Sequence, residues 1–288
     1  MKGKSESWQS AHPPKVVPAP VRKLALIGAG KLGEGLLTGM LGSHFIPVSN
    51  VEATVEYQHD ADSLHERYGV KAHTDNRQAV HGADLVLICL KPQQVKGVLL
   101  EVKKHLQKDV LIVSAAASVT TAFIERHLGR PARVVRAMPN TPCLIRQGMT
   151  ALARGLHATD ADILAAQAIF GAMGRIVVVD EKHMDAITGL SASGPAYVYT
   201  IIEALAEGGV KMGLPRTLST ELTAQTLLGA SAMVLQTGEH PAKLKDVVTT
   251  PAGCTIDGLL ELEEGGLRVT LIKAVVKAAI RAKQLVES

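Results

Sequence analysis

The chain has 288 residues, of which 47% are hydrophobic, 20% are charged and 3% are aromatic. This is about twice the roughly 150 residues of a typical domain, so two domains are expected. The net charge of +4 is small, and several of the basic residues fall in the first two dozen positions, which together with the low aromatic content argues against nucleic-acid binding.

Residues 1–20 carry four prolines and no apolar periodicity, so we predict a disordered extension there. No window of the sequence approaches the ~18 consecutive apolar residues of a membrane helix, and the N-terminus lacks the apolar core of a secretory signal. We therefore expect a cytoplasmic protein that does not contact a membrane. The three cysteines are far apart in sequence, which favours reduced thiols and no metal site.

From residue 21 to about residue 180, short aliphatic runs alternate with helical stretches, as is typical of βαβ units. Runs such as DLVLIC are apolar on both faces, as expected for strands covered by helices on both sides. The sequence therefore predicts an α/β fold whose residues 21–180 form a doubly wound, Rossmann-like parallel sheet. The expected strands are 23–27, 51–56, 84–89, 110–113, 133–136, 149–153 and 175–179.

A GxGxxG motif, GAGKLG, follows the first expected strand and opens a helix, which is the context of a dinucleotide-binding loop. Its residues are Gly28, Ala29, Gly30, Lys31, Leu32 and Gly33. In this interpretation the first glycine permits a tight turn, the second lets the backbone approach a pyrophosphate, and the third lets helix and strand pack closely. The alternative is a glycine turn that binds nothing.

Two further positions at the expected carboxyl edge of the sheet are candidates for cofactor contacts. Glu56 lies where an acid can bond the ribose 2′-hydroxyl and repel a 2′-phosphate, which favours NAD, although a solvated strand end explains it equally well. The cofactor is thus NADP or NAD, with the preference open. The segment Leu90, Lys91 and Pro92 is either a cofactor contact or a plain helix start.

Residues 181–288 have no convincing strand and contain three long aliphatic segments, at 195–212, 216–237 and 266–286. The first of these is apolar around most of its circumference, which a helix tolerates only when it is buried on nearly all sides. We therefore predict a helical domain that packs against a second copy of the chain.

Six blocks of the sequence form a recognisable set. They are GAGKLG, LKPQQV at 90–95, RAMPNTP at 136–142, TGLSASGPAY at 188–197, EGGVKMGLPR at 207–216 and TTPAGCTIDGLLELEEGGLR at 249–268. Together they resemble pyrroline-5-carboxylate reductases, and the resemblance runs from about Val21 to Val286. It implies NADPH- or NADH-dependent reduction of 1-pyrroline-5-carboxylate to L-proline, the last step of proline biosynthesis. It also implies a homodimer or a ring of dimers built from the C-terminal helices.

The resemblance also suggests which residues hold the substrate. A small anion can be held by backbone amides and hydroxyls at a helix start, and Thr255 is the expected catalytic hydroxyl, which orients or relays the imine proton. For Cys254, packing is favoured over a nucleophilic role. The expected substrate residues are Ser193, Thr250, Pro251, Gly253, Cys254 and Thr255, and further expected cofactor contacts are Ala116 and Asn140.

The sequence departs from the usual family pattern at three sites. The family usually has GSGPAY where this chain has ASGPAY, beginning with Ala192. It usually has SPGGTT where this chain has TPAGCT, which includes Ala252 and Cys254. It usually has AAG where this chain has AAS, which ends with Ser118. These departures are small residues for small ones, and they bear on the width of the pocket more than on the reaction.

Other functions are less well supported. A β-hydroxyacid dehydrogenase needs a lysine early in the interdomain helix, and here Lys211 comes about four turns too late. A reductase of another cyclic imine and a non-catalytic dinucleotide sensor stay open as alternatives.

Overall fold

The computed structural model describes residues 21–284, so the disordered extension expected at residues 1–20 lies outside the described part. The described chain divides into two compact units, residues 21–192 with 278–284, and residues 193–277. The sequence analysis places the domain boundary at 180/181. In the structure the segment after it groups with the first unit, because Met184 is buried against Met138, Ala151 and Ala153.

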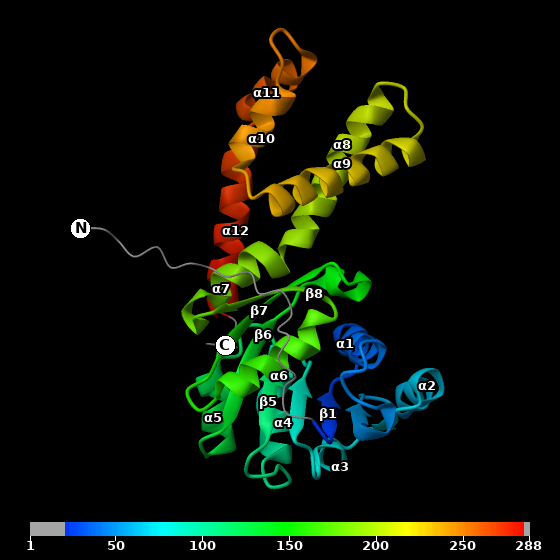
Figure 1. Ribbon diagram of the computed structural model, residues 1–288, viewed down its shortest axis with the longest axis vertical. Coiled ribbons are helices and arrows are strands. Elements are labelled where there is room, and N and C mark those ends of the chain that lie inside the picture. The colour runs from blue at the N-terminus through cyan, green and yellow to red at the C-terminus, as the bar shows by residue number, and fades with distance from the viewer. Residues whose placement is uncertain (1–20, 285–288) are drawn as a thin grey trace, which may run out of the picture. The chain divides into compact units, whose positions relative to one another are not determined.

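The first unit contains an eight-stranded sheet in the order β3-β2-β1-β4-β5-β6-β7-β8 (Figure 1). Strands β1 to β6 are parallel, β7 runs antiparallel to β6, and β8 is parallel to β7. The parallel sheet is thus confirmed, with one reversal at β7. The strands are β1 (Leu24–Ile27), β2 (Val51–Thr54), β3 (Lys71–His73), β4 (Leu85–Ile88), β5 (Leu111–Ser114), β6 (Arg133–Met138), β7 (Gly148–Arg154) and β8 (Gly174–Val179).

The reversal at β7 follows from the length of its connection to β6. Only the short helical turn η2 (Thr141–Ile145) separates these strands, and a parallel crossover needs a dozen or more residues, usually with a helix. The strand therefore returns in the opposite direction. Strand β3 has no counterpart among the predicted strands.

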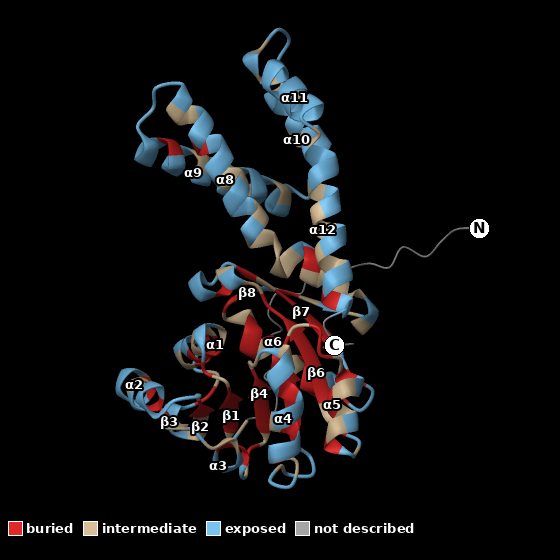
Figure 2. Ribbon diagram, turned by 180° about the vertical axis from the view of Figure 1, so that it is seen from behind, coloured by how far each residue is buried: buried red, intermediate tan, exposed pale blue. Residues whose placement is uncertain are grey.

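Helices cover both faces of the sheet and form two large cores beside the small cluster around Met184, and Figure 2 shows the sheet as a buried layer. In β1, Leu24 and Leu26 face one core while Ala25 and Ile27 face the other, as a strand buried on both faces requires. The doubly wound arrangement is confirmed. The helices are α1 (Lys31–Gly42), α2 (Gln58–Tyr68), α3 (Asn76–Val80), α4 (Pro92–Val102), α5 (Thr121–Leu128) and α6 (Asp160–Gly171).

Three short elements follow the sheet before the second unit begins. They are η3 (Glu181–His183), α7 (Met184–Ile187) and a π-helical turn, η4 (Thr188–Ala192). This segment carries the first half of the TGLSASGPAY motif, so its anchorage to the sheet bears on the site.

The second unit is helical, as predicted, and consists of α8 to α11 with most of α12. The helices are α8 (Gly194–Lys211), α9 (Arg216–Thr237), α10 (Pro241–Val248), α11 (Cys254–Glu264) and α12 (Leu267–Gln284). Helices α8 and α9 contact each other, and the Ser219 hydroxyl donates to the Ala206 carbonyl oxygen at 2.7 Å. Many large apolar side chains on these helices are exposed in the single chain. Within residues 21–284, no helix is both long enough and apolar enough to cross a bilayer.

Candidate functional site

The GAGKLG segment, which connects β1 to the first turn of α1, contains three glycines whose surroundings differ. Gly28 has a φ of +87°, and a Cβ there would lie 2.8 Å from the Cys89 carbonyl oxygen; a Cβ on Gly33 would collide with the Gly28 carbonyl. Around the Cβ position of Gly30, in contrast, no described residue other than Gly30 and its two chain neighbours has an atom within 4 Å. The backbone requires the first and third glycines, while the middle one leaves open space that a ligand can approach.

The N-terminus of α1 opens onto this space. Its capping residue, Gly30, has no side chain to bond the first amides of the helix, so these N–H groups are available to a ligand. The helix dipole adds positive potential, and an anion is stabilised at such an end. The loop therefore fits the pyrophosphate of a dinucleotide.

A cavity of about 610 Å³ lies beside this loop, at the carboxyl ends of β1, β2 and β4, where open α/β sheets bind their ligands. It brings together seven of the twelve cofactor residues predicted from the sequence. These are Gly28, Ala29, Gly30, Lys31, Glu56, Leu90 and Lys91.

The other five predicted cofactor residues do not line this cavity. Leu32 and Gly33 belong to α1, and Pro92 is the first residue of α4, for which Lys91 is the N-cap. The segment at 90–92 is thus both a helix start and a cavity wall. Ala116 is fully buried after β5.

Asn140 orders the loop that follows β6. Its side-chain Oδ1 accepts from the Met149 N–H at 2.9 Å, and its Nδ2 donates to the Ser191 carbonyl oxygen at 3.3 Å. These bonds give Asn140 a loop-ordering role, and the cofactor contact expected for it stays a prediction.

Several residues of the cavity were missed by the sequence analysis. Asp60, Leu64 and Arg67 line it from one face of α2, and Glu34 lines it from α1. The spacing of four and three residues along α2 is the signal that could have found them, because such residues share a helix face. Glu34 and Arg67 form an ion pair across the two helices.

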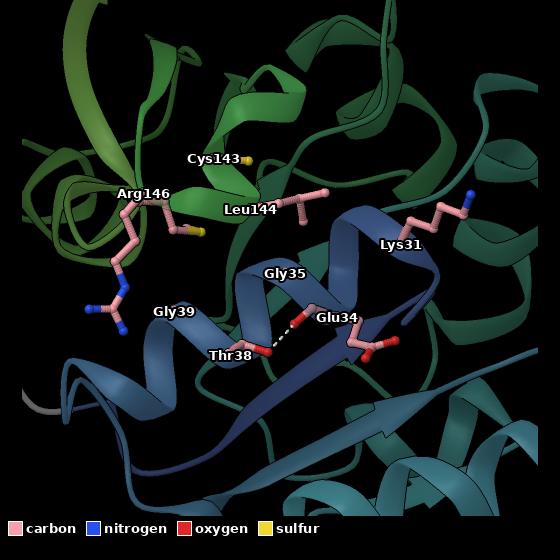
Figure 3. A pocket seen from close by; sticks show the side chains of 9 residues that line it. Lys31, Glu34, Gly35, Thr38, Gly39, Cys143, Leu144 and Arg146 are labelled. Carbon is pink, nitrogen blue, oxygen red and sulfur yellow. Dashed lines mark hydrogen bonds between the residues drawn. The ribbon is translucent and has the colours of Figure 1, made fainter. Parts of the chain in front are cut away.

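A smaller cavity of about 330 Å³ lies between α1 and η2, and Figure 3 shows its lining. Cys143, Leu144 and Met173 contribute apolar walls, and the Thr38 hydroxyl already donates to the Glu34 carbonyl oxygen at 2.9 Å. Lys31 and Glu34 line both cavities, but this one offers less room and does not include Gly28, Ala29 or Gly30, so the larger cavity is the candidate cofactor site.

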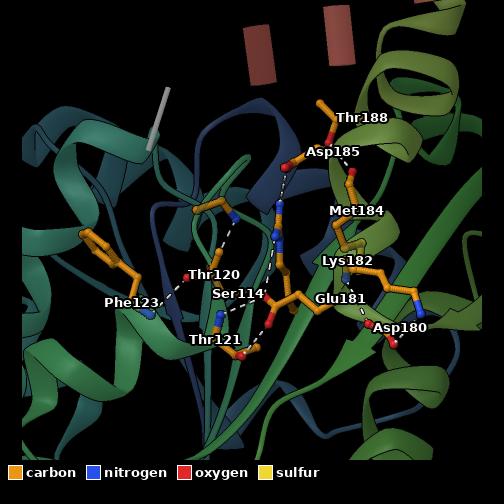
Figure 4. A network of polar contacts seen from close by, with 12 residues as sticks. Ser114, Thr120, Thr121, Phe123, Asp180, Glu181, Lys182, Met184, Asp185 and Thr188 are labelled. Carbon is orange, nitrogen blue, oxygen red and sulfur yellow. Dashed lines mark hydrogen bonds and ion pairs between the residues drawn. The ribbon is translucent and has the colours of Figure 1, made fainter. Parts of the chain in front are cut away.

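A buried polar network anchors the segment that precedes the second unit (Figure 4). Arg136 in β6 is 1% exposed and pairs with Glu181 at 3.5 Å and Asp185 at 3.4 Å. Glu181 also accepts from the Thr121 N–H at 2.8 Å and from its hydroxyl at 2.6 Å. The network joins β6, α5 and the η3–α7 segment, and the sequence analysis did not find it.

The predicted substrate residues lie in the second unit. Thr255 is the second residue of α11, and the N-cap, Gly253, makes no side-chain cap, so the first amides of this helix are also available. A Cβ on Gly253 would lie 2.5 Å from the Thr250 hydroxyl oxygen, which keeps the turn compact. Ser193 is the N-cap of α8. Cys254 is exposed, so the packing role expected for it has no support in the single chain.

Two family models match the chain. One is described as pyrroline-5-carboxylate reductase dimerisation and covers residues 181–285, and the other as NADP oxidoreductase, coenzyme F420-dependent, and covers residues 23–118. The second match contains the glycine loop and all the described residues that line the larger cavity.

Similar proteins cover nearly the whole chain. The chain is 42% identical to pyrroline-5-carboxylate reductase of Arabidopsis thaliana, over 94% of this chain and 98% of that protein. It is 44% identical to that of Glycine max, over 93% and 98%. Among solved structures, a pyrroline-5-carboxylate reductase of Coxiella burnetii matches with a TM-score of 0.85 and 36% identity, over 93% and 99%. That of Plasmodium falciparum, with NADP bound, matches with a TM-score of 0.83 and 30% identity, over 92% and 98%.

Proposed function

The chain belongs to the pyrroline-5-carboxylate reductase family, and on this premise we propose that it reduces 1-pyrroline-5-carboxylate to L-proline with NADPH or NADH, the last step of proline biosynthesis. The observation that carries the proposal is the similarity to reductases of this name over more than nine-tenths of both chains. The open space at Gly30 supports it independently, because a dinucleotide needs such a space.

We assign the larger cavity to the dinucleotide. In this assignment the α1 amides and Lys31 bind the pyrophosphate, Glu56 faces the adenosine ribose, and Leu90 with Lys91 forms the wall after β4. Ala116 and Asn140 act in the loops after β5 and β6. The nicotinamide, when bound, supplies the hydride that reduces the imine carbon.

The substrate carboxylate is assigned to the turn before α11. Thr250, Pro251 and Gly253 leave room there because their side chains are small or absent, and the first amides of α11, at Cys254 and Thr255, have no side-chain cap. Thr255 holds the proton on the ring nitrogen by a hydrogen bond and orients the ring, since an alcohol is too weak an acid for classical general-acid catalysis. Ser193 contributes from the start of α8.

The match to a dimerisation domain makes the protein an oligomer, and we propose a homodimer or a ring of dimers formed through the C-terminal helices. The exposed apolar side chains of α8, α9 and α12 support this, because monomers rarely expose so many. We further propose that the enzyme works in the cytoplasm, with no nucleic-acid or membrane partner.

The test follows the absorbance of reduced nicotinamide with purified protein and racemic 1-pyrroline-5-carboxylate, with NADPH and NADH in parallel. Thr255→Ala should lower kcat by about tenfold to a hundredfold, as loss of a transition-state hydrogen bond does, and Thr255→Ser should restore much of it. Absence of turnover with both cofactors, despite tight dinucleotide binding, would overturn the proposal in favour of another imine or a sensor.

A further inference from the structure

An ion pair lies on the wall of the larger cavity, and the assignments above give it no role. Glu34 on the first turn of α1 and Arg67 near the end of α2 both line the cavity, beside Glu56 and Asp60. Among the described residues that line this cavity, Arg67 is the one arginine. Its planar guanidinium is the group best suited to bind a phosphate.

Glu34 holds this guanidinium from the other side. The Arg67 Nη1 group donates to Glu34 Oε1, and the Tyr68 hydroxyl donates to the same oxygen at 2.7 Å. The Arg67 guanidinium also lies 5.1 Å from the centre of the Tyr68 ring. These bonds lower the pKa of Glu34, first through Arg67 and then through Tyr68, so the carboxylate is ionised at neutral pH and the pair is formed.

The charge balance of the cavity depends on this pair. Three carboxylates, Glu34, Glu56 and Asp60, and three cations, Lys31, Lys91 and Arg67, line its wall. Lys31 is the first residue of α1 and Lys91 is the N-cap of α4, and the pyrophosphate is assigned to the start of α1. A 2′-phosphate on the adenosine ribose would meet Glu56 and Asp60, and the arginine that would neutralise it is already bound to Glu34.

We propose that Glu34 is a specificity-determining residue of the cofactor site, because by pairing with Arg67 it withholds the guanidinium from a 2′-phosphate and so favours NAD over NADP. The proposal rests on the assignment of this cavity to the dinucleotide. If Glu56 alone set the preference, removing the Glu34 carboxylate from α1 would not change it. The proposal instead predicts that this removal changes the ratio of NAD to NADP affinity.

Direct binding of NAD⁺ and NADP⁺, measured by calorimetry at low salt, tests the proposal without turnover. These two ligands differ only in the 2′-phosphate. Glu34→Gln keeps the size of the side chain and an acceptor for Tyr68 while it releases Arg67. It should lower the Kd for NADP⁺ by about tenfold, as a new charge-assisted pair does, and leave the Kd for NAD⁺ within about twofold.

Two further variants isolate the pair. Glu66→Gln removes the same charge from an exposed residue next to Arg67 that does not line the cavity, and it should change neither Kd. Arg67→Gln should have little effect on NADP⁺ binding alone but should abolish the gain in the Glu34→Gln background, which is the signature of coupling in a double-mutant cycle.

The outcomes separate this proposal from the assignment of the cavity. If the unmodified protein binds neither dinucleotide, the assignment itself fails and the proposal falls with it. If both dinucleotides bind but Glu34→Gln leaves their ratio unchanged, or tightens both equally, the pair does not set the preference. If Arg67→Gln alone weakens NADP⁺ binding strongly, Arg67 already binds the 2′-phosphate and the proposal is wrong.

Discussion

Four described residues with side chains have a backbone conformation that favours glycine, and two of them lie where the sequence departs from the family pattern. Ser118, after β5, has a φ of +64°, and Ala252, before α11, has a φ of +57°. The family usually has glycine at both positions. These departures therefore change more than pocket width, because a side chain in the left-handed region costs about 1–2 kcal/mol.

Replacing Ser118 with glycine should stabilise the protein. The Ser118 hydroxyl is buried and makes no hydrogen bond in the described structure, so Ser118→Gly removes both backbone strain and an unsatisfied polar group. After the entropy cost of glycine, a gain of about 1 kcal/mol is expected. Ala252→Gly, at an exposed site without a buried hydroxyl, should give a smaller gain. Thermal melting at fixed protein concentration measures the shift in melting temperature for each variant. Equal shifts for Ser118→Gly and Ala252→Gly would contradict the cost assigned to the unbonded Ser118 hydroxyl.

At the scale of elements, Arg136 holds the η3–α7 segment against the sheet. Arg136→Gln leaves Glu181 and Asp185 without their cation. It should lower the free energy of unfolding by about 2–3 kcal/mol. This is less than the cost for a fully buried pair, because the two carboxylates are one-quarter to one-third exposed. Arg136→Lys should recover part of it. Chemical denaturation measures the change, and an unaltered midpoint for Arg136→Gln would show that the pair contributes nothing net.

The ion pair between α1 and α2 predicts a specific acid sensitivity. The pKa of Glu34 is lowered in the folded protein from its ordinary value of 4.5, so the folded state binds this proton less readily than the unfolded chain. The contribution of the ion pair to the free energy of unfolding is therefore complete above about pH 4.5, and it is lost as the pH falls through the pKa that Glu34 has in the folded protein. The melting temperature of Glu34→Gln should lie below that of the unmodified protein at pH 7 and converge with it in acid. The Glu66→Gln control should show no such convergence, and a constant difference for Glu34→Gln would contradict the pairing.

The central strands of the sheet can be predicted from the sequence, whereas the edge strand β3 and the buried polar contacts of Arg136 cannot. Strands such as β4 were predicted because they are apolar on both faces, whereas β3 is a three-residue edge strand of sequence KAH without a hydrophobic run. Arg136 lies in an apolar strand, and its partners follow 45 and 49 residues later, so no local pattern reveals them. The glycine loop was predictable because its spacing and its strand–helix context are local.

At the scale of the whole molecule, a single chain leaves many large apolar side chains of the helical unit exposed. Leu228 and Leu235 on α9 are 59% and 58% exposed, and their spacing of seven residues puts them on one helix face. The sequence analysis expected helices buried on nearly all sides, and the exposed faces show that one chain does not bury them. Oligomer formation is therefore part of the stability of this unit.

Charged substitutions on this face should dissociate the oligomer. Leu228→Glu places a carboxylate in an apolar contact, which should weaken association by at least about tenfold and make the melting temperature depend on protein concentration. Leu156→Glu is the matched control, because Leu156 is 84% exposed and belongs to the first unit, not to the helices assigned to the interface. Sedimentation velocity over a range of concentrations distinguishes the two variants. If Leu228→Glu keeps the unmodified assembly at all concentrations, this face of α9 lies outside the interface, and another exposed face of α8 or α12 must form it.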